Sequence, residues 1–118
     1  MSVKGVFASA NERRDYAAGE VIFSEGEPSQ HMFGVVSGAV ELRHEGRVVV
    51  TLGSEDTFGE LGVIDGTTRS LTAVAVEPTT VAVIDERTFL YMVQETPMFA
   101  IQVMRALASR IRQLDDGR

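Results

Sequence analysis

The sequence lacks cysteine, which excludes disulfide bonds, thiol nucleophiles and zinc–thiolate sites. Lysine is nearly absent too: Lys4 is the single lysine among eleven basic residues, and the formal net charge is −6. Nucleic-acid binding needs a dense cationic face. Because no lysine- or arginine-rich run occurs, we expect no direct contact with nucleic acid.

No uncharged apolar stretch approaches the roughly 20 residues that span a membrane, and the apolar run near the amino terminus is too short for a secretory signal. We therefore expect a cytoplasmic protein with no membrane partner.

Short strands separated by turns dominate the first half of the chain. Glycines recur between β-branched or aromatic runs at 21–23, 32–36, 39–42 and 47–52, a pattern typical of a β-sandwich or barrel. The sequence His-Glu-Gly-Arg at 44–47 predicts a hairpin tip, because glycine adopts positive φ without strain. Two further apolar strands are predicted at 71–77 and 80–85, separated by Pro78.

The hydrophobic period changes after Asp85, which indicates helices. Asp85 or Glu86 is predicted to cap a short helix that runs to about Thr96. Its inner side is expected to carry Phe89, Leu90 and Val93.

A second, longer helix is predicted from Met98 to Leu114, after Pro97 in a position that suits a first helical turn. Its apolar residues recur at spacings of three and four, as an amphipathic helix requires. Arg105, Arg110 and Arg112 are expected largely off this stripe. The stripe is interpreted mainly as core packing, with part of it as the seam of a homodimer; its members are Ile101, Met104, Leu107, Ala108, Ile111 and Leu114.

Residues 58–70 read FGELGVIDGTTRS and contain the candidate ligand-binding residues. Gly59 and Gly62 let the backbone approach a ligand closely, and a helical turn over 60–64 would direct amide N–H groups toward a phosphate. The planar guanidinium of Arg69 matches two phosphate oxygens. The carboxylate of Glu60 only accepts hydrogen bonds and therefore suits a ligand hydroxyl. The alternative is a surface loop in which Glu60 and Arg69 form a structural ion pair.

This segment resembles the phosphate-binding cassette of cyclic nucleotide-binding domains. That family includes the catabolite activator protein and the regulatory subunits of cyclic-AMP-dependent protein kinase. The stretch YAAGEVIFSEGEPSQHMFGVVSGAVEL at 16–42 is similar to the family's opening strands. The resemblance implies a mainly β fold in one domain over 1–118. Its double-stranded β-helix (jelly-roll) barrel would cover about 15–85, with a short cassette helix, and its carboxy-terminal helices about 86–115.

The resemblance also implies a ligand, cyclic AMP or cyclic GMP, and no cofactor or metal. By position, Glu60 would bind the ribose 2′-hydroxyl and Arg69 the cyclic phosphate. The base would be capped near Leu114 and Asp115. Ser70 is compatible with either nucleotide, and cyclic AMP is the expected one. The residues expected to bind the nucleotide are Phe58, Gly59, Glu60, Leu61, Arg69, Ser70 and Leu71.

Three positions depart from the family pattern. Thr68 replaces a proline that would fix φ before the arginine, and Ala73 replaces a valine. Leu71 replaces an alanine close to the phosphate, where its side chain either crowds the site or turns outward.

These features leave three functions open. The leading one is a stand-alone sensor in which nucleotide binding changes the packing of 86–114, and a dimer mate or another protein reads the change. The second is a degenerate domain that serves as an interaction module without ligand, with Leu71 filling the phosphate site. The third is the sensory part of a transcription factor, if the chain is a fragment.

An enzyme is not expected. Asp56, Glu60 and Asp65 lie close in sequence, but no histidine is near enough to act as a base at neutral pH. His31 and His44 are interpreted as surface residues, because two histidines without a third make a poor metal site.

Overall fold

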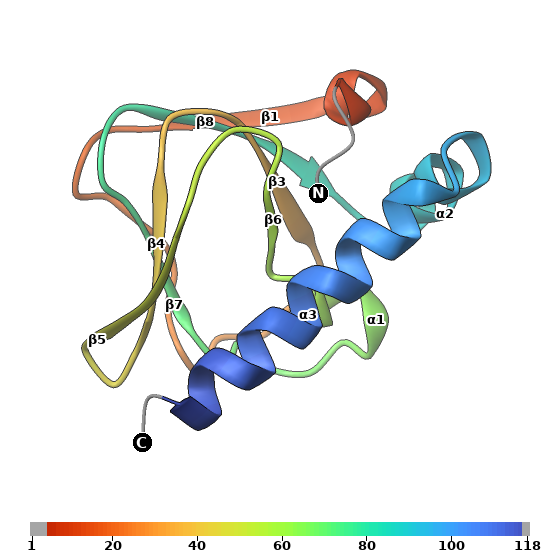
Figure 1. The fold of residues 1–118 in the computed structure, drawn as a ribbon. Helices are drawn as coiled ribbons and strands as arrows, with labels where there is room; N and C mark the ends of the chain where they lie inside the picture. Colours follow the sequence, from red (N-terminus) through yellow and green to blue (C-terminus); the bar gives the residue numbers. More distant parts are fainter. Residues whose placement is uncertain (1–4, 117–118) are drawn as a thin grey trace.

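The structure is a computed structural model that describes residues 5–116, and its strands form two four-stranded sheets (Figure 1). The strands are β1 (Glu12–Tyr16), β2 (Val21–Phe23), β3 (Met32–Ser37), β4 (Val40–His44), β5 (Arg47–Leu52), β6 (Thr57–Phe58), β7 (Thr72–Ala75) and β8 (Thr79–Ile84). One sheet has the order β1-β8-β3-β6 and the other β2-β7-β4-β5, with antiparallel pairing throughout. The predicted mainly β jelly roll is confirmed.

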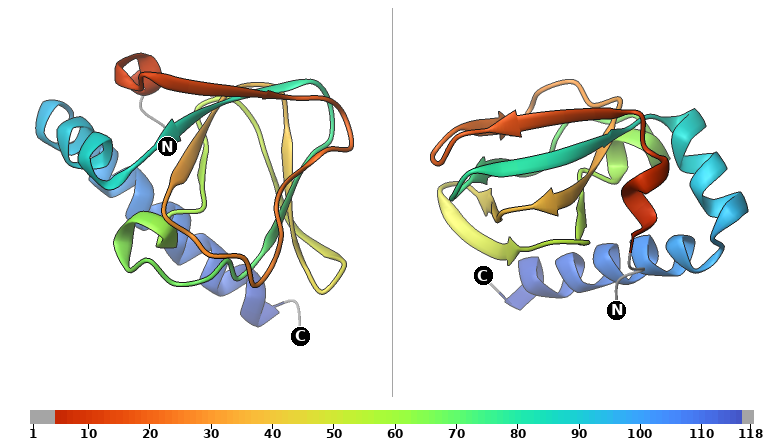
Figure 2. Two further views of the ribbon diagram at one scale, coloured as in Figure 1. Left: turned by 180° about the vertical axis from the view of Figure 1, so that it is seen from behind. Right: turned by 90° about the horizontal axis from the view of Figure 1, so that it is seen from above.

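The helices lie outside the two sheets. They are a 3-10 turn η1 (Val6–Ser9), the short α1 (Leu61–Ile64), α2 (Glu86–Glu95) and α3 (Met98–Asp116). Figure 1 shows α3 running diagonally past α1 toward the end of β5, and α3 contacts both β5 and β6. In Figure 2, α2 and η1 lie together at one end of the sheets. None of the helices in this described range is long and apolar enough to span a membrane.

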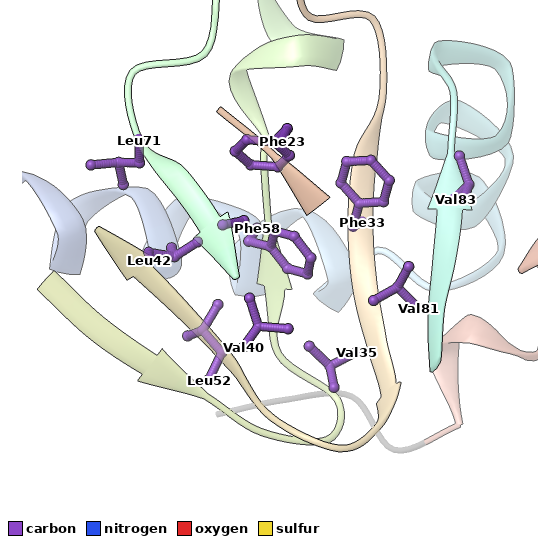
Figure 3. Packing of buried hydrophobic residues seen from close by; sticks show 11 residues of the cluster. Phe23, Phe33, Val35, Val40, Leu42, Leu52, Phe58, Leu71, Val81 and Val83 are labelled. Carbon is purple, nitrogen blue, oxygen red and sulfur yellow. The ribbon is translucent and has the colours of Figure 1, made fainter. Parts of the chain in front are cut away.

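The main core lies between the sheets (Figure 3). Three rings form its centre: Phe33 stacks on Phe58 with 5.2 Å between centroids, and Phe23 lies within 5.9 Å of both. On β4, Val40 and Leu42 are buried whereas Glu41 and Arg43, on the other face, are half-buried. The period-two pattern of the sequence therefore places one face of the strand in the core.

Two local predictions are confirmed. Glu45 and Gly46 form the tip between β4 and β5 with φ of 51° and 82°, and two successive positive φ values are typical of a type I′ hairpin turn. Asp85 caps α2, because its Oδ1 accepts a hydrogen bond of 2.8 Å from the backbone N–H of Thr88.

The predicted inner side of α2 was partly wrong. Leu90 is exposed, whereas Met92 is buried in a second core cluster that also contains Phe7, Ile84 and Phe99. Phe89 and Val93 pack against this cluster. The reason is helical phase: Phe89, Met92 and Val93 fall on one face at 100° per residue, and Leu90 lies a quarter-turn away from Phe89.

The predicted stripe of α3 also required correction. Met104 and Ile111 are 57% and 63% exposed, so these two residues do not pack in the core. Phe99 and Val103 are buried instead, and the same face continues to Arg110, which was expected off the stripe but is only 8% exposed. The helix therefore turns a face that includes a charged residue toward the sheets.

Candidate functional site

A cavity of about 210 Å³ lies where residues 59–71 meet α3. It contains most of the residues predicted from the sequence, since Gly59, Glu60, Leu61, Arg69, Ser70, Leu71 and Leu114 all line it. The rest of the lining is Phe23, Ser29, Leu42, Thr68, Leu107, Arg110 and Ile111. Segments far apart in the chain therefore converge on one hollow. The side chain of Asp115, the other expected base cap, lies outside the described residues.

Phe58 does not line the cavity. Its side chain is fully buried and stacks on Phe33 in the core. Its place in the sequence motif has a structural explanation, because it anchors the strand from which the cavity-lining residues follow.

Arg69 is a buried cation in the wall of the cavity. Its side chain is 8% exposed, and its guanidinium carbon lies 4.1 Å from the centroid of the Phe23 ring. Its Nη1 donates to the Gly59 carbonyl oxygen at 3.1 Å, and its buried Nε has no hydrogen-bond partner among the described residues. Burial lowers the pKa of Arg69, and the carboxylates of Glu27 and Glu60 partly oppose this shift. Since arginine keeps its charge in proteins, the cavity presents a fixed positive charge with a donor still available.

Glu60 is almost completely buried, at 2% exposed, and has two protein partners. Its Oε1 accepts from Nη1 of Arg110 at 2.5 Å, and its Oε2 accepts from the Thr57 hydroxyl at 2.6 Å. Arg110 also donates to the Thr57 carbonyl oxygen through Nη2. The ion pair found for Glu60 among the described residues is therefore with α3, and the alternative of a bridge to Arg69 is not seen. Two carboxylate oxygens offer about four acceptor sites, which leaves capacity for a ligand hydroxyl.

Glycine is required at the start of α1. Gly59 has φ of 73°, and a Cβ there would lie 2.8 Å from Arg69 Nη1. A Cβ on Gly62 would lie 2.3 Å from Ser29 Oγ and 3.0 Å from Arg69 Nη1. The absence of both side chains lets the helical turn pack directly on the buried guanidinium.

Leu71 is 9% exposed and belongs to the same buried cluster as Leu42 and Phe23 (Figure 3). It forms part of the cavity wall, and the cavity remains beside it. Its bulk is therefore accommodated within the core.

Sequence reasoning missed three lining residues with polar side chains, Ser29, Thr68 and Arg110, and had considered Thr68 only as the replacement for a proline. Arg110 carried a detectable signal: it lies three residues after Leu107 and four before Leu114, on the inner face of α3. Ser29 carried no such signal, because a single serine in a loop is ordinary. The structure also places His44 close to Glu25 and Glu45, at 3.5 Å and 3.4 Å. Within residues 5–116, no three histidine, aspartate or glutamate side chains form a group that could hold a metal ion.

Comparison with known proteins gives the family. Residues 13–96 match the model of the cyclic nucleotide-binding domain. The chain is 35% identical over 109 residues to the Cyclic AMP receptor protein of Thermus thermophilus, covering 88% of this chain and 50% of that protein. Its structure resembles cAMP-bound PfPKA-R with a TM-score of 0.78 and 25% identity, covering 89% of this chain and 36% of the other. It also resembles a structure from a cyclic-GMP-dependent signalling pathway that regulates bacterial phytopathogenesis. That TM-score is 0.72 at 28% identity, over 90% of this chain and 88% of the other.

The fold is thus a β jelly roll, and the chain belongs to the cyclic nucleotide-binding domain family. It spans half the length of the Thermus relative.

Proposed function

We propose that this chain is a single regulatory domain that binds a cyclic nucleotide, with cyclic AMP as its ligand, and transmits binding to α3. The observation that carries the proposal is the cavity itself: a buried arginine with an unpartnered donor faces it from residues 59–71, and a glutamate tied to α3 lies in the same wall.

The cyclic phosphate is assigned to Arg69 and Ser70, and the ribose hydroxyl to Glu60. Arg69 supplies the positive charge and a donor, and a charge-assisted hydrogen bond of this kind contributes roughly 1.5–3 kcal/mol. Gly59 and Leu61, beside Glu60 at the start of α1, line the same side of the cavity.

The base is assigned to the apolar part of the lining, with Leu114 as its cap. This part consists of Phe23, Leu42, Leu71, Leu107, Ile111 and Leu114. Guanine carries more exocyclic polar groups than adenine, and an apolar wall leaves such groups without partners, which costs free energy. This argument, together with the name of the Thermus relative, favours cyclic AMP over cyclic GMP.

The coupling to α3 is assigned to Glu60 and Arg110. A ribose hydroxyl that binds Glu60 competes with or reorients its 2.5 Å bond to Arg110. Two arrangements of α3 with different nucleotide affinity would then exchange population, with a coupling of about 1–3 kcal/mol as in other allosteric proteins.

Isothermal titration calorimetry with cyclic AMP and cyclic GMP tests the ligand assignment. The wild type is expected to bind cyclic AMP more tightly than cyclic GMP, and Arg69→Ala is expected to lose at least tenfold in affinity. Arg87→Ala, an exposed arginine of α2 outside the cavity, serves as the matched control and should bind as the wild type does. Absence of binding by the wild type, or unchanged binding by Arg69→Ala, would refute the assignment.

Leu71 bears on the alternative of an interaction module without ligand. That hypothesis requires the leucine to fill the phosphate site. The cavity that persists beside Leu71 and the unpartnered Nε of Arg69 support ligand binding instead.

We also propose that the exposed face of α3 mediates a homodimer or binds a protein partner. Met104 and Ile111 lie two turns apart on this face and are more than half exposed, a spacing that suits a helical seam. Sedimentation equilibrium should show a dimer that Met104→Glu dissociates, whereas Val48→Glu, a similarly exposed apolar position on β5, should not. A monomeric wild type, or equal effects of the two variants, would contradict this proposal.

A further inference from the structure

Ser29 is a buried polar residue whose environment is unexplained by the fold. It lies between β2 and β3 with an exposure of 3%, and its hydroxyl has no hydrogen-bond partner in the described part of the chain. Buried hydroxyls nearly always have a partner, because leaving one unsatisfied destabilises the protein. The hydroxyl oxygen is itself buried, but Ser29 is one of the residues that line the cavity, so rotation of its side chain would bring the hydroxyl to a ligand there.

The position of Ser29 is fixed relative to Arg69. The loop that carries it pairs with Arg69 through two backbone hydrogen bonds, one from the Gly26 N–H to the Arg69 carbonyl and one from the Arg69 N–H to the Glu27 carbonyl, both 2.8 Å. The missing side chain of Gly62 then brings α1 against both residues, because its Cβ position lies 2.3 Å from Ser29 Oγ and 3.0 Å from Arg69 Nη1. The hydroxyl and the guanidinium therefore belong to the same wall.

The neighbouring charge determines which ligand atom suits Ser29. A guanidinium has donors and no acceptor, and it attracts anionic oxygen into this part of the cavity. The hydroxyl beside it has a hydrogen to donate. An oxygen that carries negative charge can accept from both groups and also offsets the charge of the guanidinium. A neutral purine edge can accept hydrogen bonds but lacks that charge, and an apolar group accepts none.

We propose that Ser29 is an additional phosphate contact, which donates its hydroxyl hydrogen to one exocyclic oxygen of the bound cyclic phosphate while Arg69 binds the charge. The inference rests on the proposed function, since it needs a cyclic nucleotide in this cavity. It gives the site a contact from the β2–β3 loop, outside residues 58–71.

Phosphorothioate analogues of cyclic AMP separate a phosphate contact from a structural role. The Rp and Sp diastereomers each replace one exocyclic oxygen with sulfur, which is a poorer hydrogen-bond acceptor. If Ser29 contacts one of the two oxygens, Ser29→Ala should weaken cyclic AMP binding by about tenfold and change the ratio of the Rp and Sp dissociation constants several-fold. Ser54→Ala, at an exposed serine that does not line the cavity, should leave both quantities unchanged.

Thermal unfolding of the unliganded variants completes the test. Because the hydroxyl has no protein partner among the described residues, Ser29→Ala should unfold at the wild-type temperature or above it. A lower unfolding temperature with an unchanged Rp-to-Sp ratio would overturn the inference and assign Ser29 to the fold alone. Wild-type affinity in Ser29→Ala would also overturn it while leaving the proposed function intact. Failure of the wild type to bind any cyclic nucleotide would reject the proposed function itself.

Discussion

The ion pair between Glu60 and Arg110 should show a large coupling energy, because it is costly to break on one side only. Its side chains are 2% and 10% exposed and its N–O distance is 2.5 Å. Two unit charges about 4 Å apart attract each other by about 4 kcal/mol at an effective dielectric constant of 20, against about 1 kcal/mol in water. Arg110→Met leaves the buried carboxylate with Thr57 as its remaining partner among those described, and removal of one member of such a pair costs about 3–5 kcal/mol.

A double-mutant cycle measures this coupling. Arg110→Met, Glu60→Gln and the double variant would be unfolded in urea to obtain the coupling energy and by heating to obtain the melting temperature, both followed by circular dichroism. Arg110→Met is expected to lower the melting temperature by about 12–20 °C, at roughly 4 °C per kcal/mol for a domain of this size. The double variant should recover much of that loss, because the uncompensated charge is gone.

A second ion pair in the same protein provides the control. Arg43 and Glu41 on β4 are 2.7 Å apart, similar to the buried pair, but their side chains are 38% and 23% exposed. The coupling energy of Glu41→Gln and Arg43→Met is expected to be at most about 1 kcal/mol. Equal coupling energies in the two cycles, or a cost below about 1 kcal/mol for Arg110→Met, would refute the argument from burial.

Gly62→Ala is expected to lower the free energy of unfolding by about 1–3 kcal/mol, because the added Cβ would overlap Ser29 Oγ. Unfolding in urea measures this change. Gly53→Ala is the control, because a Cβ added at Gly53 meets no atom within 4 Å. Asp85→Asn should weaken the cap of α2 in a pH-dependent way. The hydrogen bonds from Thr88 lower the pKa of Asp85, so the carboxylate stabilises the fold above its unfolded pKa and loses this effect as pH falls through the lower folded value. The stability difference between wild type and Asp85→Asn should therefore shrink in acid. Cyclic AMP at about 100 times its Kd should raise the apparent free energy of unfolding by about 2.7 kcal/mol, as calorimetry would detect.

Each of these expectations has a contrary result. Equal stability of the two glycine variants would mean that the close packing at Gly62 relaxes without cost. If the wild type remained more stable than Asp85→Asn in strong acid, the stabilising effect of Asp85 would not come from its ionised carboxylate. No stabilisation by saturating cyclic AMP would mean that the nucleotide does not select the folded state.

The fold could be predicted where local chemistry determines it. The hairpin tip at Glu45 and Gly46 depends on positive φ. The cap at Asp85 depends only on a carboxylate that accepts a hydrogen bond from the backbone N–H three residues later in the chain. The glycine and arginine of the cassette likewise lie within one short segment. Each of these features is set by neighbours in the chain, which a sequence displays directly.

The helix faces could not be assigned with the same success. α3 carries apolar residues on two faces, one with Phe99 and Val103 and one with Met104 and Ile111, and periodicity alone does not decide which one meets the sheets. A charged residue counts against burial in such a pattern. Arg110 is buried because Glu60, on a distant segment, compensates its charge, and that partnership exists only in three dimensions.

The inner face of α3 has a practical consequence for anyone who transplants this module into a biosensor. The family match ends at residue 96, yet Leu107, Arg110 and Leu114 belong to the walls of the cavity proposed to bind the nucleotide. A graft cut at the family boundary would include Arg69, the proposed phosphate ligand, but would leave Glu60 without Arg110 and the cavity open on the side that α3 covers. The smallest unit that can be transferred therefore includes α3, and a reporter domain should be fused after the end of that helix.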